Sequence, residues 1–180
     1  MRIYTAPEKL KISELEDAVS VFLSGGITGC RNWQEDVITA LGSFPNTALY
    51  NLDSLVVFNP RREEFVDDDV NAIAQIKWEH VCLELCDIVS VFFPASESVQ
   101  PITLYELGKY SRSGKSQIVT IQSGYKRELD VVTQMALDPG PSECTVYQNY
   151  EDAVFNHARR IAGVASYIGK SLRRGRFAND

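Results

Sequence analysis

The chain of 180 residues lacks any apolar run near the roughly 20 residues that a membrane-spanning helix needs. Its first residues, MRIYTAPEKLKISE, also lack the apolar core of a signal peptide. We therefore expect a cytoplasmic protein that has no membrane partner.

Cysteine is scarce, and none of its four copies forms a C-x-x-C pair: they are Cys30, Cys82, Cys86 and Cys144. Cysteines without such pairing favour reduced thiols over disulfides or a zinc site. Basic residues are also few, because 18 Lys and Arg stand against 24 Asp and Glu, a net charge of -6. Binding to a nucleic-acid polymer needs a basic face, so we expect none.

Two familiar cofactor motifs are missing as well. The segment SGGITG (Ser24–Gly29) does not have the G-x-G-x-x-G spacing of a dinucleotide site, and the next apolar segment ends in Asn59 rather than an acid. The segment GKYSRSGKS (Gly108–Ser116) has five residues between its glycines, where a phosphate loop has four. We expect no cofactor.

A metal site is not indicated either. His80 and His157 have no metal-ligand spacing, and the acidic run Asp67–Asp69 is typical of a solvated loop or a helix start. Basic residues gather in the tail GKSLRRGRFAND (Gly169–Asp180), which we interpret as a solvated helix end.

The sequence does have a regular alternation of apolar strands and helices. We expect strands at Val19–Leu23, Ser54–Pro60, Asp87–Pro94, Gln117–Ile121 and Cys144–Tyr147, and helices at Trp33–Leu41, about Val70–Cys86, Thr103–Ser113 and about Tyr150–Leu172. Short loops between them require crossover connections. This pattern predicts an α/β three-layer sandwich with a five-stranded parallel sheet. We expect one domain over residues 1–180, with a core at about 19–150 and a C-terminal helix.

The helix expected at Val70–Cys86 carries a carboxylate in an unusual place. On a helical wheel one stripe is apolar (Val70, Ala74, Trp78, Val81, Leu85) and a narrow stripe is polar (Lys77, His80, Glu84). Gln75 and Glu79 lie with Cys82 and Cys86, opposite the polar stripe. A carboxylate there should be paired, protonated or facing a cleft, unless it reaches solvent or an arginine.

Glu106 allows two interpretations. Thr103 and Glu106 form T-x-x-E, the pattern of a capping box at a helix start. Its position favours a ligand instead, because Glu106 follows the third strand, at the edge of a parallel sheet where ligands bind. Gly108 also costs the helix about 1 kcal/mol relative to Ala, without a local reason. These residues alone leave both interpretations open.

Two carboxylates that converge on one cleft suit chemistry at a glycosidic carbon. One attacks the anomeric carbon, and the other, with its pKa raised by burial, handles the proton of the leaving group.

Four segments together are similar to one protein family: FLSGGITGCRNWQ, FNPRR, QIKWEHVCLELCDIVSVFFP and TLYELGKYSRSGK. Over roughly residues 19–125 they resemble the nucleoside 2-deoxyribosyltransferase-like proteins. Their superfamily also contains nucleoside 2-deoxyribosyltransferases and 2'-deoxynucleoside 5'-monophosphate N-glycosidases. The resemblance implies a flavodoxin-like, Rossmann-like fold, a nucleoside or nucleotide substrate and a homo-oligomer.

The resemblance also implies roles for residues. The glutamate of the family's E-L-G motif attacks the sugar and corresponds to Glu106. A second acid stands eight positions before the aspartate that opens the third strand, which makes it Glu79 here, although the transferases usually have Asp. We expect the substrate to be bound by Gly25, Gly26, Thr28, Trp33, Gln75, Asp87, Gln100 and Thr103.

Some positions differ from the family pattern. The transferases carry an acid near the position of Gln100, so base selection is open. Ser24, Thr28 and Arg31 are candidates for holding a 5'-phosphate, as the glycosidases do. Arg61 and Arg62 are either ligand contacts or surface charges.

The working hypothesis is cleavage of the N-glycosidic bond of a deoxynucleoside or nucleotide through a glycosyl-enzyme on Glu106. Transfer of the sugar to a second base makes the protein a pentosyltransferase of nucleotide metabolism, and transfer to water makes it a hydrolase. The alternative from another class is a non-catalytic nucleotide-binding or sensing domain, in which Glu106 is only a cap.

Overall fold

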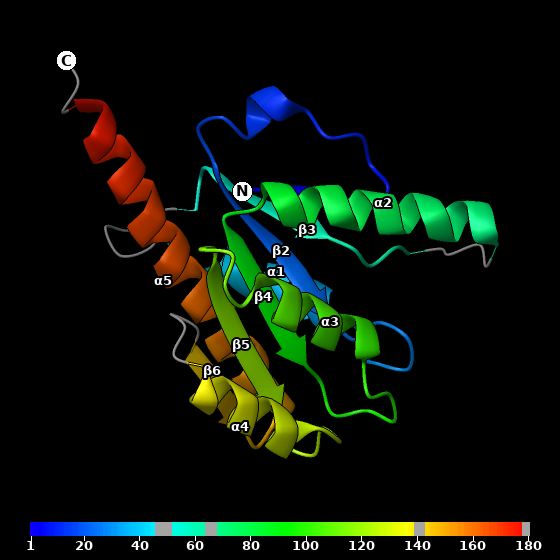
Figure 1. The fold of residues 1–180 in the computed structure, drawn as a ribbon. Coiled ribbons are helices and arrows are strands. Elements are labelled where there is room, and N and C mark those ends of the chain that lie inside the picture. Colours follow the sequence, from blue (N-terminus) through cyan, green and yellow to red (C-terminus); the bar gives the residue numbers. More distant parts are fainter. Residues whose placement is uncertain (46–51, 64–67, 139–142, 178–180) are drawn as a thin grey trace.

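A six-stranded parallel sheet forms the centre of the protein (Figure 1). The computed structural model describes residues 1–45, 52–63, 68–138 and 143–177. The strands are β1 (Arg2–Thr5), β2 (Val19–Gly25), β3 (Leu55–Asn59), β4 (Ile88–Phe93), β5 (Ser116–Gln122) and β6 (Glu143–Tyr147). Their order across the sheet is β1-β3-β2-β4-β5-β6. The order of β2 to β6 is that of a flavodoxin-like doubly wound sheet, which confirms the predicted fold class.

The sequence prediction missed β1, so the expected count of five strands was wrong by one. Only four residues, RIYT, form this strand, and half of them are polar. It exists because the outer edge of β3 offers unpaired backbone groups, to which Arg2–Thr5 bonds in parallel register. Such pairing with a distant segment leaves little trace in a short sequence pattern.

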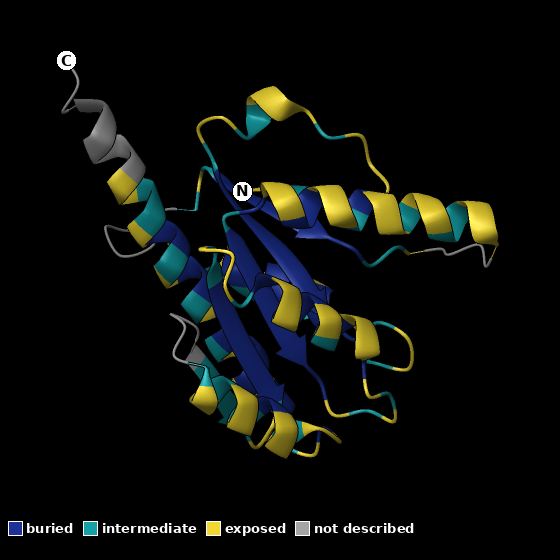
Figure 2. Cartoon of the chain, viewed as in Figure 1, coloured by how far each residue is buried: buried dark blue, intermediate teal, exposed yellow. Residues whose placement is uncertain are grey.

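Five α-helices cover the sheet: α1 (Trp33–Ser43), α2 (Asp69–Leu85), α3 (Pro101–Tyr110), α4 (Glu128–Leu137) and α5 (Tyr150–Phe177), with a short 3-10 helix at Ile12–Glu14. Helices α1 and α5 pack on one face, and α2, α3 and α4 pack on the other. Figure 2 shows the strands buried between helices whose outer faces are exposed. Helix α4 was not predicted. Within the described ranges no helix combines the length and apolarity needed to cross a membrane.

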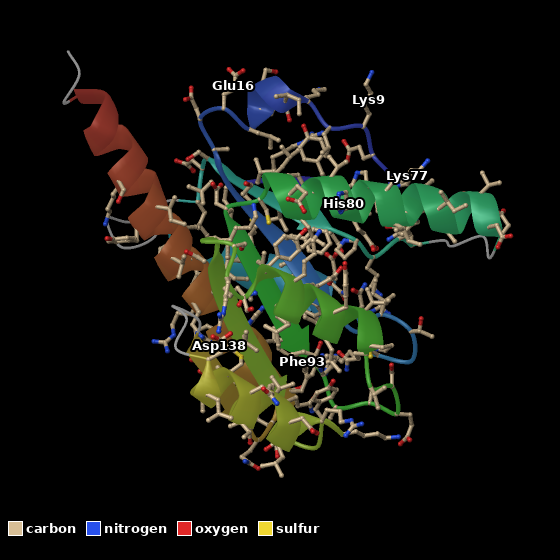
Figure 3. All side chains as sticks on the ribbon, in the orientation of Figure 1. Lys9, Glu16, Lys77, His80, Phe93 and Asp138 are labelled. Carbon is tan, nitrogen blue, oxygen red and sulfur yellow. The ribbon has the colours of Figure 1, made fainter. Side chains whose placement is uncertain are left out.

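The face of α2 that packs against the sheet differs from the apolar stripe that the helical wheel indicated. Of that stripe only Trp78 is buried, whereas Val70 is 78% exposed and Val81 and Leu85 are exposed as well. The contacts with the sheet come from Trp78, Cys82, Leu83 and Cys86. Because α2 carries apolar residues on nearly all sides, the wheel could not define one buried face. The polar stripe was predicted correctly, since Lys77 and His80 (Figure 3) and Glu84 are exposed.

The second histidine, His157, belongs to the core beneath the sheet. Its two ring nitrogens lie 2.6 Å from the Ser90 hydroxyl and 2.8 Å from the Thr120 hydroxyl. Burial lowers the pKa of His157 to about 3, so its ring is neutral at physiological pH. His157 is thus a structural residue of the core, whereas His80 is exposed.

Candidate active site

A cavity of about 240 Å³ opens at the carboxyl ends of β2 and β4. Strand β3 pairs with one side of β2, and β4 pairs with the other side. The direction in which strands are added to the sheet therefore reverses at β2, and ligands bind at such a point. Its walls come from the end of β2 and the loop after it, from α2, and from the start of α3: they include Ser24, Gly25, Gly26, Thr28, Glu79, Gln100, Thr103 and Glu106.

Glu106 faces this cavity and does not cap α3. The helix begins at Pro101 with Gln100 as its N-cap, so Thr103 is already helical and Glu106 is the sixth residue. The capping-box interpretation is therefore wrong, because the acid of a capping box stands at the third helical position. The Glu106 carboxylate instead accepts a hydrogen bond from the Ser24 hydroxyl at 2.5 Å and is 8% exposed.

The surroundings of Glu106 favour its neutral form. Burial raises the pKa of Glu106 to about 7, the hydrogen bond from Ser24 lowers it, and the nearby charge of Glu79 raises it. A buried carboxyl that titrates near neutral pH costs stability, and such groups gather at functional sites. The two carboxyl groups are close enough for their charges to interact.

Glu79 reaches the cavity from α2 with the support of Gln75, one helical turn before it. The Gln75 side-chain amide donates to the Glu79 carboxylate at 2.6 Å and to the backbone oxygen of Pro60 at 2.6 Å. Burial raises the pKa of Glu79, while the bond from Gln75 and the charge of Arg62 lower it. Gln75 thus contacts the second carboxylate rather than lining the cavity.

Gln100 presents a hydrogen-bond acceptor without a partner. Its backbone adopts a left-handed conformation with φ 50°, and the residue is 4% exposed. The Nε2 group donates to the backbone oxygen of Pro94 at 2.9 Å, which fixes the orientation of the amide. Within the described part of the chain the Oε1 atom has no hydrogen-bond partner. This buried acceptor belongs to a residue in the wall of the cavity.

Two glycines bring the end of β2 close to its neighbours. A Cβ atom on Gly25 would overlap the Phe92 backbone oxygen and the Trp33 ring, and one on Gly26 would overlap Cys30 and Gln100. The Trp33 indole donates to the backbone oxygen of Gly26 at 2.9 Å. At Gly25 and Gly26 the wall of the cavity is therefore backbone alone, and the Trp33 side chain holds this backbone in place.

Two of the predicted binding residues lie away from the cavity. Trp33 is fully buried and stacks on Phe92, so its ring offers no surface to a base. Asp87 precedes β4 and accepts hydrogen bonds from Ser20, at the opposite end of the sheet from the cavity. Parallel strands place Asp87 at the amino edge, whereas the cavity lies at the carboxyl edge.

Gly108 does not face the carboxylates. It lines a second cavity of about 320 Å³ between α3 and α4, together with Leu104, Leu107 and Val131. A Cβ atom on Gly108 would meet no atom within 4 Å. Gly108 therefore lies outside the lining of the cavity that holds Glu79 and Glu106.

The arginines near the first loop have protein partners. Arg31 lies over the Tyr150 ring and forms ion pairs with Asp36 and Glu151. Arg61 donates to the backbone oxygens of Cys30 and Arg31, each at 3.0 Å. Arg61 thus braces the loop after β2, and neither arginine lines the cavity that holds Glu106.

Sequence reasoning missed the link between Ser24 and Glu106. Ser24 was considered only as a phosphate contact, because 82 positions separate it from Glu106. The signal that was available is a polar residue near the end of a buried strand, at the carboxyl edge of the sheet where ligands bind.

The comparisons with known proteins identify the family of the chain. No curated protein matches the chain. The model of one family, described as nucleoside 2-deoxyribosyltransferase like, matches residues 18–125, a range that contains β2, both carboxylates and Gln100. Because this range is more than half of the 180 residues, the chain belongs to the nucleoside 2-deoxyribosyltransferase-like family.

Proposed function

We propose that the protein cleaves the N-glycosidic bond of a deoxynucleoside and transfers the sugar to a second base, through a glycosyl-enzyme on Glu106. The observation that carries this proposal is the buried Glu106 carboxyl at the topological switch point, with a second, half-buried carboxyl group, Glu79, in the same cavity. Family membership supports the same class of reaction.

In the first half-reaction the ionised Glu106 attacks the anomeric carbon of the sugar. A carbon–oxygen bond forms, the carbon–nitrogen bond breaks, and its electron pair goes to the base nitrogen. Glu79 donates a proton to the departing base. Burial raises the pKa of Glu79, and this is the direction that favours a proton donor.

In the second half-reaction a nitrogen of the incoming base attacks the same carbon. The carbon–oxygen bond breaks, its electron pair returns to Glu106, and Glu79 accepts the proton of the incoming base. Gly25 and Gly26 let the backbone approach the sugar, and Thr28 and Thr103 offer hydroxyl groups from the cavity wall.

The charge of the cavity favours a nucleoside over a nucleoside 5'-monophosphate. Its lining contains two carboxyl groups and no Lys or Arg among the described residues. A phosphate dianion placed there would face like charge without a cation to offset it. Arg31, the candidate for holding a phosphate, is occupied by Asp36 and Glu151.

The test is an assay of base release from deoxynucleosides and their 5'-monophosphates, with and without a second free base. We expect base exchange that requires the second base and is lost in Glu106→Ala. Intact-mass spectrometry of acid-quenched wild type with donor alone should show the added mass of one deoxyribosyl group, and the variant should show none.

The controls separate the alternatives. Glu97→Gln changes a glutamate whose side chain is fully exposed, and it should behave as wild type. Release of base into water without an acceptor would identify a hydrolase instead. Binding of nucleosides without any turnover would leave the non-catalytic sensing domain as the better interpretation.

Gln100 gives a separate prediction on base recognition. We expect Oε1 to accept a hydrogen bond from the base, so removing the donor from the base should lower kcat/KM about tenfold in wild type. Deoxyadenosine and the deoxyriboside of unsubstituted purine are a suitable pair. In Gln100→Leu the two substrates should react at equal rates. An unchanged preference in this variant would remove Gln100 from base recognition.

A further inference from the structure

Ser24 is a polar side chain near the carboxyl end of β2, on the face that the strand turns toward the core. Side chains two positions apart on a strand share a face, so Phe22 and Ser24 both point toward the helices α2 and α3. Phe22 belongs to the apolar core on that side, and Ser24, although 1% exposed, carries a hydroxyl. The strand thus places one hydrogen-bond donor directly beneath α3.

The hydroxyl of Ser24 has one proton, and the geometry directs it to one oxygen of Glu106. The Ser24 Oγ atom lies 2.5 Å from Oε2, a distance typical of a hydrogen bond to an ionised carboxylate. Engagement of Oε2 fixes the rotation of the carboxylate group about its last bond. Oε1 is then the oxygen on which a lone pair is available to a substrate.

We propose that Ser24 is a positioning residue, which holds Glu106 by Oε2 so that Oε1 attacks the anomeric carbon. This inference rests on the proposed function and names a residue that contacts Glu106 rather than the substrate. A nucleophile held in one orientation reacts faster because fewer unproductive arrangements compete with the reactive one.

The bond has a second consequence during the reaction. When Oε1 bonds to the sugar, Oε2 becomes the carbonyl oxygen of a glycosyl ester and its negative charge falls. When the acceptor base attacks, the ester bond breaks and the charge returns to the carboxylate. Because a hydrogen bond to a charged oxygen is stronger, Ser24 stabilises Glu106 as the leaving group of this second step.

The charges that face Glu106 set the direction of the expected pH effect. Glu79 on α2 raises the pKa of Glu106, whereas Lys109 on α3 and the Ser24 hydrogen bond lower it. Arg62 acts on the pKa of the neighbouring Glu79. Loss of the Ser24 hydroxyl should therefore raise the pKa of Glu106 further, with the other three groups unchanged.

The first experiment compares the pH dependence of kcat/KM for base exchange in wild type and Ser24→Ala. We expect a loss of about tenfold at pH 6, because a hydrogen bond to a charged group is worth about this factor. The midpoint of the acid limb should move to higher pH, and Ser24→Thr, which keeps a hydroxyl, should restore it. A loss of rate without movement of the midpoint would overturn the proposal.

Ser20→Ala is a matched control. Ser20 lies on the same strand, is buried, and also donates its hydroxyl to a carboxylate, Asp87, at 2.8 Å. It lies at the amino end of the strand, away from the cavity, so this variant should keep the wild-type midpoint. Equal shifts in Ser20→Ala and Ser24→Ala would mean a general structural effect and would also overturn the proposal.

A second measurement does not depend on catalysis. The Glu106 carboxyl is titrated by ¹³C NMR in protein labelled at glutamate, with its signal assigned from Glu106→Gln. A higher pKa in Ser24→Ala supports the contact even if no substrate turns over, which would be a failure of the proposed function alone. An unchanged pKa shows that Ser24 does not hold Glu106.

Discussion

Replacing Glu106 by glutamine is expected to stop base exchange and, above pH 7, to make the protein more stable. We expect loss of the nucleophile to lower kcat by at least about 10³-fold. Glutamine keeps the size of the side chain and can still accept a hydrogen bond from Ser24. The activity is therefore lost through chemistry and not through a change of shape.

The stability gain follows from the pKa of Glu106. Burial raises this pKa from 4.5 in the unfolded chain to about 7 in the folded protein. Folded protein thus binds the proton more tightly, so Glu106 costs no stability below pH 4.5. As the pH rises from 4.5 to 7 the unfolded chain ionises first, and stability falls. Above pH 7 the full cost of about 3 kcal/mol is present in wild type and absent in the variant.

Urea denaturation at pH 5 and at pH 8 measures this effect. The advantage of Glu106→Gln should be small at pH 5 and about 3 kcal/mol at pH 8. Glu97→Gln, at a fully exposed glutamate, should show no such dependence. A variant as stable as wild type at pH 8 would contradict the raised pKa, whereas a stable variant with full activity would contradict the role of Glu106 as nucleophile.

Gly25→Ala is expected to destabilise the protein by about 3 kcal/mol, since inserting atoms into a filled core has costs of this order. The added methyl group would overlap the backbone oxygen of Phe92 on the neighbouring strand and the ring of Trp33. Neither can move aside, because Phe92 is paired in the sheet and Trp33 is fully buried and stacked on Phe92.

The same change elsewhere should act in the opposite direction. Gly163 lies within α5, and a Cβ atom there would meet no atom within 4 Å. Gly163→Ala should stabilise the protein by up to about 1 kcal/mol, because alanine is the better helix former. Urea denaturation of both variants checks the pair. Equal effects of the two substitutions would show that the close approach at Gly25 is not rigid.

The sequence was sufficient to predict an element of secondary structure where one local pattern of residues dominates. Mainly apolar runs, such as Val19–Leu23 and Ile88–Phe93, form the central strands because both faces of a parallel sheet are buried. Their alternation with helices predicted the order of elements, and from it the sheet edge where Glu106 lies. The edge strand Arg2–Thr5 was not predictable, because distant pairing rather than its own composition makes it a strand.

The site itself divides in the same way. The sequence alone determined which carboxyl groups stand out. Glu79 lies opposite the solvent stripe of its helix, and Glu106 follows the third strand at the edge of the sheet where ligands bind. Only the tertiary structure decided that Glu106 is not a cap, because α3 begins at Pro101, and that Ser24 is its partner. Ser24 and Glu106 are 82 positions apart. Their contact depends on the register of β2 in the sheet and on how α3 packs against it, and local sequence spacing encodes neither.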